Sequence, residues 1–116
     1  MLRTMMRAKI HRATLTGTHL NYAGSISIDT VLLRAADILP NERVQVLNLS
    51  TGNRLETYAI EGEAGSGAIE LNGPAARLGT VGDKIIIVAY GLADDAEATA
   101  LQPKIVHVNE ENAPTD

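Results

Sequence analysis

The dipeptide Gly24–Ser25 could perform covalent chemistry on its own peptide bond. The Ser25 hydroxyl can attack the Gly24 carbonyl carbon, which turns the peptide bond into an ester. Glycine suits the position before the serine, because it has no Cβ to block the attack and tolerates a distorted backbone. β-Elimination of the ester and hydrolysis would leave a pyruvoyl group at a new N-terminus, and its ketone can form an imine with an amine. The same dipeptide recurs at Gly65–Ser66, so an ordinary turn or the start of a strand is the alternative for Gly24–Ser25.

Four short motifs occur along the chain in a fixed order. They are Lys9–Thr14, Asn21–Ser25, Arg54–Tyr58 and Asn72–Ala76. In this order they resemble the family of pyruvoyl-dependent aspartate 1-decarboxylases, and the resemblance runs from Met1 to about Val108. Each motif alone is a weak signal, whereas four in the right order are a strong one.

This resemblance implies an activity, a cofactor and an assembly. The activity is decarboxylation of L-aspartate to β-alanine and CO2, which supplies β-alanine for pantothenate synthesis. The chain would cleave itself into a β-chain, residues 1–24, and an α-chain, residues 25–116, with a pyruvoyl cofactor derived from Ser25 and no metal. The implied fold is a double-psi β-barrel in a homotetramer with active sites at subunit interfaces. The sequence leaves open whether cleavage is spontaneous or needs a maturation factor.

Several residues have chemistry that suits a small anionic amino acid. Arg54 offers planar, bidentate recognition of a carboxylate, and Tyr58, with a phenol pKa near ~10, can donate a proton at neutral pH. Backbone N–H groups near Gly73 and Ala75 can hold a carboxylate, although Pro74 has none. The alternatives are an exposed cation at Arg54, a packing residue at Tyr58 and a plain strand-to-helix turn over Asn72–Ala75.

The resemblance also assigns roles to particular residues. Thr57 and Tyr58 are sequence neighbours in an expected strand, so their side chains should point to opposite faces. Both can serve one site only if the strand lies at a rim or bulges there. The assigned roles are Ser25 as pyruvoyl precursor and Schiff-base residue and Tyr58 as proton donor; Thr57, Gly73, Pro74, Ala75, Arg54 and Lys9 in substrate binding; Gly24, Ser25, Thr57 and Asn72 in processing; and Tyr22 and His11 as neighbours of the site.

Four positions depart from the family pattern. Pro74 stands where Ala is common, and Ala64 replaces a common Arg. His19 occupies a position that is usually acidic or Asn, and Asn21 replaces a frequent His. Because His19 and Asn21 lie close to the expected cleavage site, they bear on the rate of self-processing.

The elements that must position these residues are mostly short strands. Alternation and β-branched residues predict strands, and Asp29 is a plausible helix N-cap. Several strands with two or three short helices suggest a small, single-domain, mainly β barrel rather than a plain meander. We expect strands over Thr4–Thr16, Arg43–Leu49 and Leu55–Ile60 (a hairpin), Ala68–Leu71, Lys84–Tyr90 (buried on both faces) and Lys104–Val108; helices over Thr30–Ile38 and Asp94–Leu101; a helical turn over Gly73–Leu78; and a disordered tail over about 109–116.

Composition excludes several classes of protein. The 116 residues contain no Cys, Phe or Trp, which excludes disulfides, thiol catalysis and Cys-ligated zinc and fits a cytoplasmic protein. No apolar run approaches the length of a membrane helix, and no motif spacing pairs His19 or His107 as metal ligands. The net charge is −4, and an acidic C-terminal end argues against nucleic-acid binding.

The sequence is open to three other interpretations. The main one is a non-cleaving β-barrel of the same fold that acts as an interaction module. A DNA-binding barrel of the swapped-hairpin kind is disfavoured by the charge. The acid-free, basic stretch over residues 1–28 could be a transit peptide, but a strand over Thr4–Thr16 explains it better.

Overall fold

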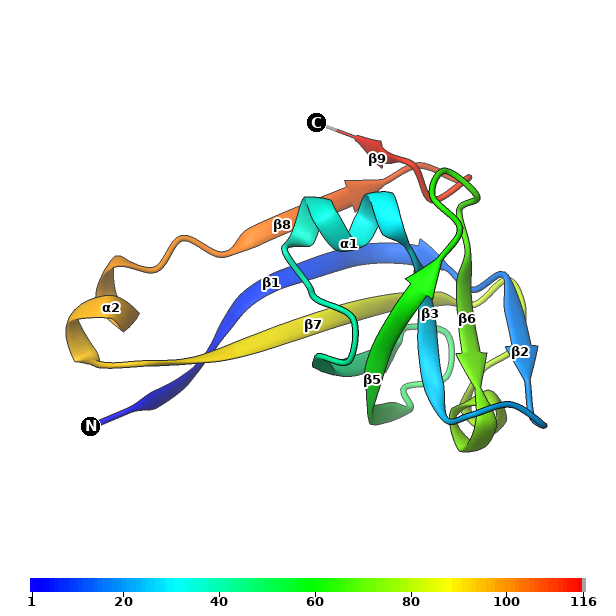
Figure 1. Ribbon diagram of the computed structural model, residues 1–116, viewed down its shortest axis with the longest axis horizontal. Helices are drawn as coiled ribbons and strands as arrows, with labels where there is room; N and C mark the ends of the chain where they lie inside the picture. The colour runs from blue at the N-terminus through cyan, green and yellow to red at the C-terminus, as the bar shows by residue number, and fades with distance from the viewer. Residues whose placement is uncertain (116) are drawn as a thin grey trace.

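A computed structural model describes residues 1–115 (Figure 1). Within them, nine strands and three short helices follow each other along the chain. The predicted mainly β, single-domain fold with two or three short helices is confirmed. The elements are β1 Arg3–Thr14, β2 Gly17–His19, β3 Ser25–Asp29, α1 Thr30–Ala36, β4 Arg43–Asn48, β5 Arg54–Gly62, β6 Ile69–Asn72, the 3₁₀ helix η1 Gly73–Leu78, β7 Lys84–Ala93, α2 Asp95–Ala100, β8 Lys104–Val108 and β9 Pro114–Thr115.

The strands pair in the order β2-β6-β3-β5-β4-β7-β1-β8-β9. The β4–β5 hairpin is antiparallel as predicted, and β1 and β7 form the longest antiparallel pair, which extends to α2 (Figure 1). Three pairs are parallel, namely β1 with β8, β2 with β6 and β3 with β5. Parallel neighbours need crossover connections, so the chain is not a plain meander. The psi crossings stay a prediction.

The core is built from Ile, Val, Leu and Ala side chains. On β1, Ala8 and Ile10 are buried in it, while Lys9 and His11 lie on the opposite face because side chains alternate along a strand. The same alternation buries Val44 and Val46 on β4. One apolar face per strand leaves the other face of the sheet free to carry polar side chains.

The expected helix after β3 is present, and the buried Asp29 caps it. One carboxylate oxygen accepts hydrogen bonds from the backbone N–H groups of Val31 (2.8 Å) and Gly65 (3.0 Å), and the other accepts one from Gly67 (2.8 Å). Burial alone would raise the pKa of Asp29, but these donors, with Gly67 the strongest, lower it below its ordinary value. Asp29 therefore ties the start of α1 to the turn between β5 and β6.

The sequence prediction differs from the structure in several details, and most strand ends shift by one to three residues. Helix α1 ends at Ala36 rather than Ile38, because Asp37 adopts a left-handed conformation with φ 56°. Ile86 on β7 is only half-buried, so the apolar run from Ile85 is not covered on both faces along its length. Strand β1 spans Arg3–Thr14, whereas the sequence predicts Thr4–Thr16.

The predicted disorder after Val108 is wrong for residues 109–115. Asn112 is buried, and its side chain accepts a hydrogen bond from the Thr14 N–H and donates to the carbonyl oxygens of Thr14 and Gly67, each at 2.8 Å. Strand β9 then pairs with β8. One buried, fully bonded asparagine fixes the segment, and composition alone does not reveal it. Asp116 lies outside the described residues.

Candidate active site

Ser25 is the first residue of β3 and is fully buried. Its hydroxyl donates a hydrogen bond to the Ala23 carbonyl oxygen at 3.1 Å and accepts one from Asn72 Nδ2 at 3.0 Å. The alternative interpretation of Gly24–Ser25, the start of a strand, therefore agrees with the local structure. Its two partners nevertheless hold the hydroxyl at a defined place beside the Gly24–Ser25 bond.

Asn72 connects this serine to a second one. It lies at the end of β6, directly opposite Ser25 in the antiparallel pairing with β3, and is 1% exposed. Its Nδ2 also donates to Ser27 Oγ at 2.9 Å. Both N–H groups of the amide are therefore engaged by β3 hydroxyls, which fixes the orientation of the amide.

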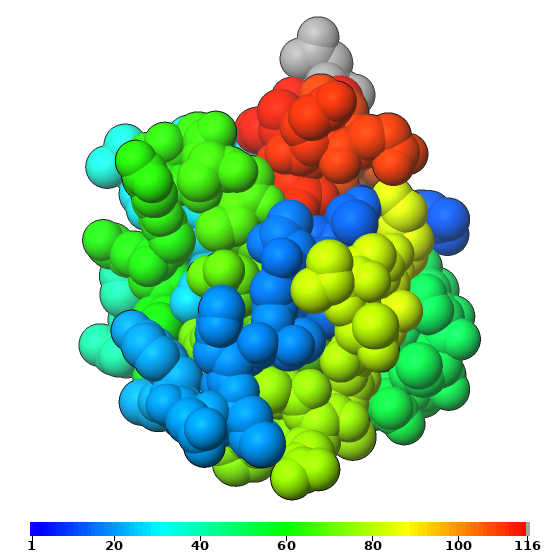
Figure 2. All heavy atoms as spheres, turned by 90° about the vertical axis from the view of Figure 1, so that its right-hand side faces the viewer, coloured from blue at the N-terminus to red at the C-terminus, as the bar shows by residue number. Residues whose placement is uncertain are grey.

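Gly73 allows the chain before Ser25 to pack directly on η1. Gly73 has φ +64°, and a Cβ there would lie 2.8 Å from Gly24 Cα and 2.8 Å from the Tyr22 carbonyl oxygen. Figure 2 shows the two segments side by side on one end of the molecule. On the other side, a Cβ at Gly24 would meet the Pro74 ring at 3.4 Å. The two glycines and Pro74 thus form one tightly packed contact.

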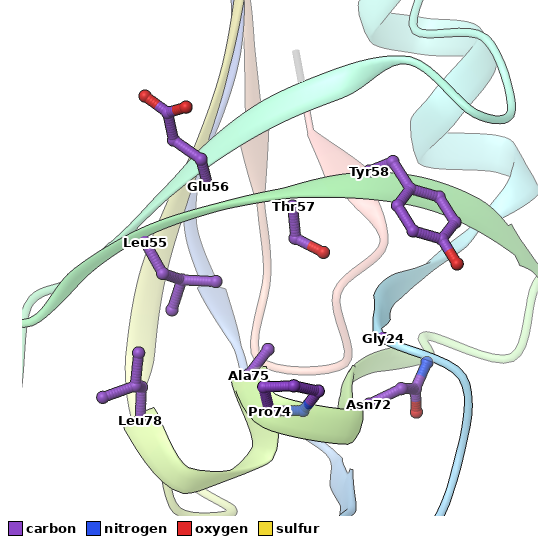
Figure 3. Close-up of a pocket in the computed structure, with 9 residues that line it drawn as sticks. All are labelled: Gly24, Leu55, Glu56, Thr57, Tyr58, Asn72, Pro74, Ala75 and Leu78. Carbon is purple, nitrogen blue, oxygen red and sulfur yellow. The ribbon is translucent and has the colours of Figure 1, made fainter.

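A cavity of about 360 Å³ opens beside this contact. Figure 3 shows the Thr57 side chain directed toward Pro74 and Ala75, the Tyr58 ring extending on the side of Gly24 and Asn72, and Glu56 pointing away. The residues that line this cavity are Gly24, Leu55, Glu56, Thr57, Tyr58, Asn72, Pro74, Ala75 and Leu78.

Thr57 and Tyr58 both reach this cavity although they are neighbours in β5. Residues 54–58 pair in continuous register with β4, whereas pairing with β3 begins only at Ala59, opposite Ile26. The other edge of β5 is therefore unpaired by β3 at Thr57 and Tyr58. Thr57 and Tyr58 therefore share the cavity because this part of β5 lies at the rim of the sheet, and not because the strand bulges there.

Lys9, His11 and Arg54 do not line this cavity. Their alternation with core residues places them on the outer face of the sheet formed by β5, β4, β7, β1 and β8. Three strand spacings separate β1 from β5, or about 14 Å. The cavity of one chain is thus lined by three of the predicted processing residues, Gly24, Thr57 and Asn72, and by Tyr58. Ser25 is buried behind this lining, and the predicted cations lie elsewhere.

His11 has no hydrogen-bond partner for its buried Nδ1 within residues 1–115. Its ring packs edge to face on His107, with centroids 5.6 Å apart. Burial, followed by the nearby charges of Lys9, His107 and Arg12, lowers the pKa of His11 below its ordinary value. The ring is therefore held neutral at physiological pH on the outer face.

A second cavity, of about 490 Å³, also touches Asn72. Tyr22, exposed, lies in its wall together with Asn21 and His19, so the two departures nearest the cleavage site share it. The His19 Nε2 atom is 3.1 Å from Glu70 Oε2. Ala64 lies in the turn after β5, away from both cavities.

Sequence reasoning missed Ser27, Leu55 and Leu78. Ser27 shares a face with Ser25 because they are two residues apart in a strand, and that spacing could have revealed it. Leu55 and Leu78 carry no chemical signal that separates them from core leucines.

Residues 1–115 contain neither a cluster of metal ligands nor a membrane-spanning helix. No group of three or more His, Cys, Asp or Glu side chains there could hold a metal ion. None of the helices in that range is long and apolar enough to cross a membrane.

Comparison with known proteins gives a consistent result. Residues 1–115 match the family model described as aspartate decarboxylase. The aspartate 1-decarboxylase of Thermoanaerobacter pseudethanolicus is 58% identical over 116 residues, covering 100% of this chain and 99% of the relative. That of Carboxydothermus hydrogenoformans is 60% identical, covering 97% of this chain and 88% of the relative. That of Listeria monocytogenes is 57% identical over the same shares.

Proposed function

The chain belongs to the aspartate decarboxylase family and is a decarboxylase of aspartate; we propose that it works with a pyruvoyl group made from its own Ser25 after self-cleavage of the Gly24–Ser25 bond. The product would be β-alanine, for pantothenate synthesis. The observation that carries this proposal is the buried Ser25 hydroxyl, held by Asn72 beside a glycine that lines a cavity.

The residues around Ser25 fit formation of this group. Attack by Ser25 Oγ forms a bond to the Gly24 carbonyl carbon and breaks that carbon's bond to the Ser25 nitrogen, which takes up the hydroxyl proton. Elimination then removes the Ser25 α-proton and releases Gly24 as a carboxylate, and water replaces the nitrogen as ammonia. The tight contact of Gly24 with Gly73 and Pro74 limits backbone movement during the attack.

The pyruvoyl group supplies a ketone that can bind the substrate amine and accept an electron pair when CO2 leaves. Tyr58 supports the next step, because its ring lies at the rim of the cavity on the side of Gly24 (Figure 3). A phenol there can return a proton to the substrate carbon. Thr57, on the same strand, faces η1 and can hold the substrate through its hydroxyl (Figure 3). The backbone N–H groups of Gly73 and Ala75 can donate hydrogen bonds to the substrate carboxylate.

The cavity lacks the two predicted cationic side chains, Lys9 and Arg54. This supports an assembly in which a second copy of the chain completes the site. Lys9, His11 and Arg54 lie on the outer face of the sheet, and that face also exposes Tyr58, Tyr90 and Ile105 at 38%, 42% and 45%. Large contiguous apolar patches mark protein interfaces, and these three side chains would contribute to such a patch on this face. We therefore propose a homotetramer with shared active sites. A cytoplasmic location is also part of the proposal.

Replacing Ser25 tests the proposal directly. Ser25→Ala has no hydroxyl to attack Gly24, so it should run as one band on a denaturing gel and release no CO2 from aspartate. Wild-type protein should run as two fragments, whereas a non-cleaving interaction module would give one band for both. Uncleaved Ser25→Ala that still released CO2 would overturn the pyruvoyl mechanism.

A further inference from the structure

A polar row crosses three strands beside the expected cleavage site. His19 on β2 lies opposite Asn72 on β6, which lies opposite Ser25 on β3. In the adjacent row, Glu70 lies between Gly17 and Ser27. Because residues two apart in a strand share a face, all of these positions lie on one face of the sheet. His19, Ser27, Glu70 and Asn72 all line the second cavity, so the Glu70 carboxylate and the Asn72 amide border the same space.

The Glu70 carboxylate is held toward His19 and over Gly17. The His19 Nε2 to Glu70 Oε2 distance is 3.1 Å. A Cβ at position 17 would lie 2.9 Å from Glu70 Oε2 and 3.1 Å from His19 Nε2. Only a glycine leaves this space free, so Gly17 is part of the arrangement that seats the pair.

Glu70 is also a potential competitor for the groups that hold Ser25. It is the direct cross-strand neighbour of Ser27, and such neighbours have Cβ atoms roughly 5 Å apart. A carboxylate is a stronger acceptor than a hydroxyl. If Glu70 left His19, it could take the Ser27 hydroxyl or an Asn72 N–H, and the amide would turn away from Ser25.

We propose that His19 and Glu70 form a positioning pair for self-cleavage. His19 binds the Glu70 carboxylate, and Gly17 leaves room for the carboxylate beside His19, so that Glu70 stays away from Asn72. Asn72 then keeps its hydrogen bond to the Ser25 hydroxyl. This inference rests on the self-cleavage proposed above. It makes His19 a determinant of the maturation rate as long as Glu70 is present, without contact of either residue to the substrate.

Removing each partner separately and then together tests this proposal. The rate is the loss of intact precursor mass over time at fixed temperature in freshly purified protein. His19→Ala frees the carboxylate and should slow cleavage about tenfold or more, since a charged acceptor outcompetes a neutral one. Glu70→Ala should cleave at close to the wild-type rate, and the double variant His19→Ala with Glu70→Ala should recover that rate. A merely structural role of His19 predicts no such rescue.

Gly17→Ala provides an independent route to the same state. The added methyl meets the flexible end of Glu70 and should displace the carboxylate while leaving both partners present. Cleavage should slow, and Glu70→Ala in the same chain should restore it. Melting temperatures measured in the uncleavable Ser25→Ala background confirm that each variant folds.

The outcomes separate this inference from the proposed function. A His19→Ala precursor that cleaves at the wild-type rate, or a double variant as slow as His19→Ala, would overturn the positioning role while leaving self-cleavage intact. A wild-type chain that stays uncleaved in the same assay would instead overturn the proposed function.

Discussion

At the scale of single residues, the Ser25 hydroxyl rests in an unreactive arrangement. Its proton is donated to the Ala23 carbonyl oxygen, which is a weak base, while Asn72 donates to its oxygen. Attack on Gly24 therefore requires the hydroxyl to leave Ala23. The bond from Asn72 can persist through that rotation, and this gives Asn72 a larger part in processing than sequence alone suggests.

Tyr58→Phe tests the assignment of the proton donor. The substitution keeps the ring and its packing at the rim of the cavity and removes only the hydroxyl. We expect normal self-cleavage and a near-normal KM for aspartate, with kcat lower by about 10²- to 10⁴-fold, because a general acid acts in the transition state. Steady-state kinetics on fully cleaved protein measure this. A variant that changed only KM would show that Tyr58 binds substrate instead.

The sequence motifs predict most, but not all, of the residues that line the cavity next to Ser25. Gly24, Thr57, Tyr58, Asn72, Pro74 and Ala75 line the cavity together. They could be predicted because each lies within one of the motifs Asn21–Ser25, Arg54–Tyr58 and Asn72–Ala76 that resemble the family. Leu55 and Leu78 are not readable, because apolar residues are the default in a core. Lys9 lies outside the cavity, because its alternation with the core residues Ala8 and Ile10 places it on the outer face of the sheet.

At the scale of elements, Asp29 holds together parts of the fold that carry the site. It caps α1 directly after β3 and binds the Gly65–Gly67 turn that leads into β6. β3 carries Ser25, and β6 carries Asn72. Loss of the Asp29 carboxylate should loosen both strands at the end opposite the cavity.

Asp29→Ala should lower the free energy of unfolding by about 3 kcal/mol, because it removes a buried charged acceptor from three N–H groups. Asp29→Asn, which keeps one acceptor oxygen, should lose less. Chemical denaturation in the Ser25→Ala background measures both. A loss within ~0.5 kcal/mol for Asp29→Ala, the size of an ordinary surface change, would show that the cap contributes little.

The pH dependence of the same bonds has a definite sign. The folded pKa of Asp29 lies below its ordinary value, so its stabilisation is complete above the unfolded pKa of about 3.9. It is lost as the pH falls through the lower folded pKa. The stability difference between wild type and Asp29→Asn should therefore shrink in acid.

Alternation and capping signals predict most elements because they depend on local sequence. The β4–β5 hairpin, the Asp29 cap, η1 and β8 are all confirmed. The segment after Val108 could not be predicted, since it depends on Asn112 reaching Thr14 and Gly67, which are distant in sequence. Gly67 also allows the close approach, because a Cβ there would lie 2.4 Å from the Glu111 carbonyl oxygen.

At the scale of the whole molecule, the shared-site proposal makes a prediction about mixed assemblies. Lys9→Ala and Tyr58→Phe should each be nearly inactive alone. If Lys9 of one copy serves the cavity of another, co-expression of the two variants creates some sites with both residues intact. Partial activity should then return in the co-purified mixture, whereas mixing separately assembled variants should restore none. A mixture that stayed inactive, despite mass-verified hybrid assemblies, would place Lys9 and Tyr58 in the same chain's site.

The most direct test of the central claim is the intact mass of the purified wild-type protein. Self-cleavage predicts two fragments, one ending at Gly24 and one beginning at residue 25. The larger fragment should be lighter than its encoded sequence by one ammonia, because a ketone replaces the amine and hydroxyl of Ser25. An active enzyme that shows a single chain of the encoded mass, or a larger fragment that keeps its N-terminal serine, would contradict the account.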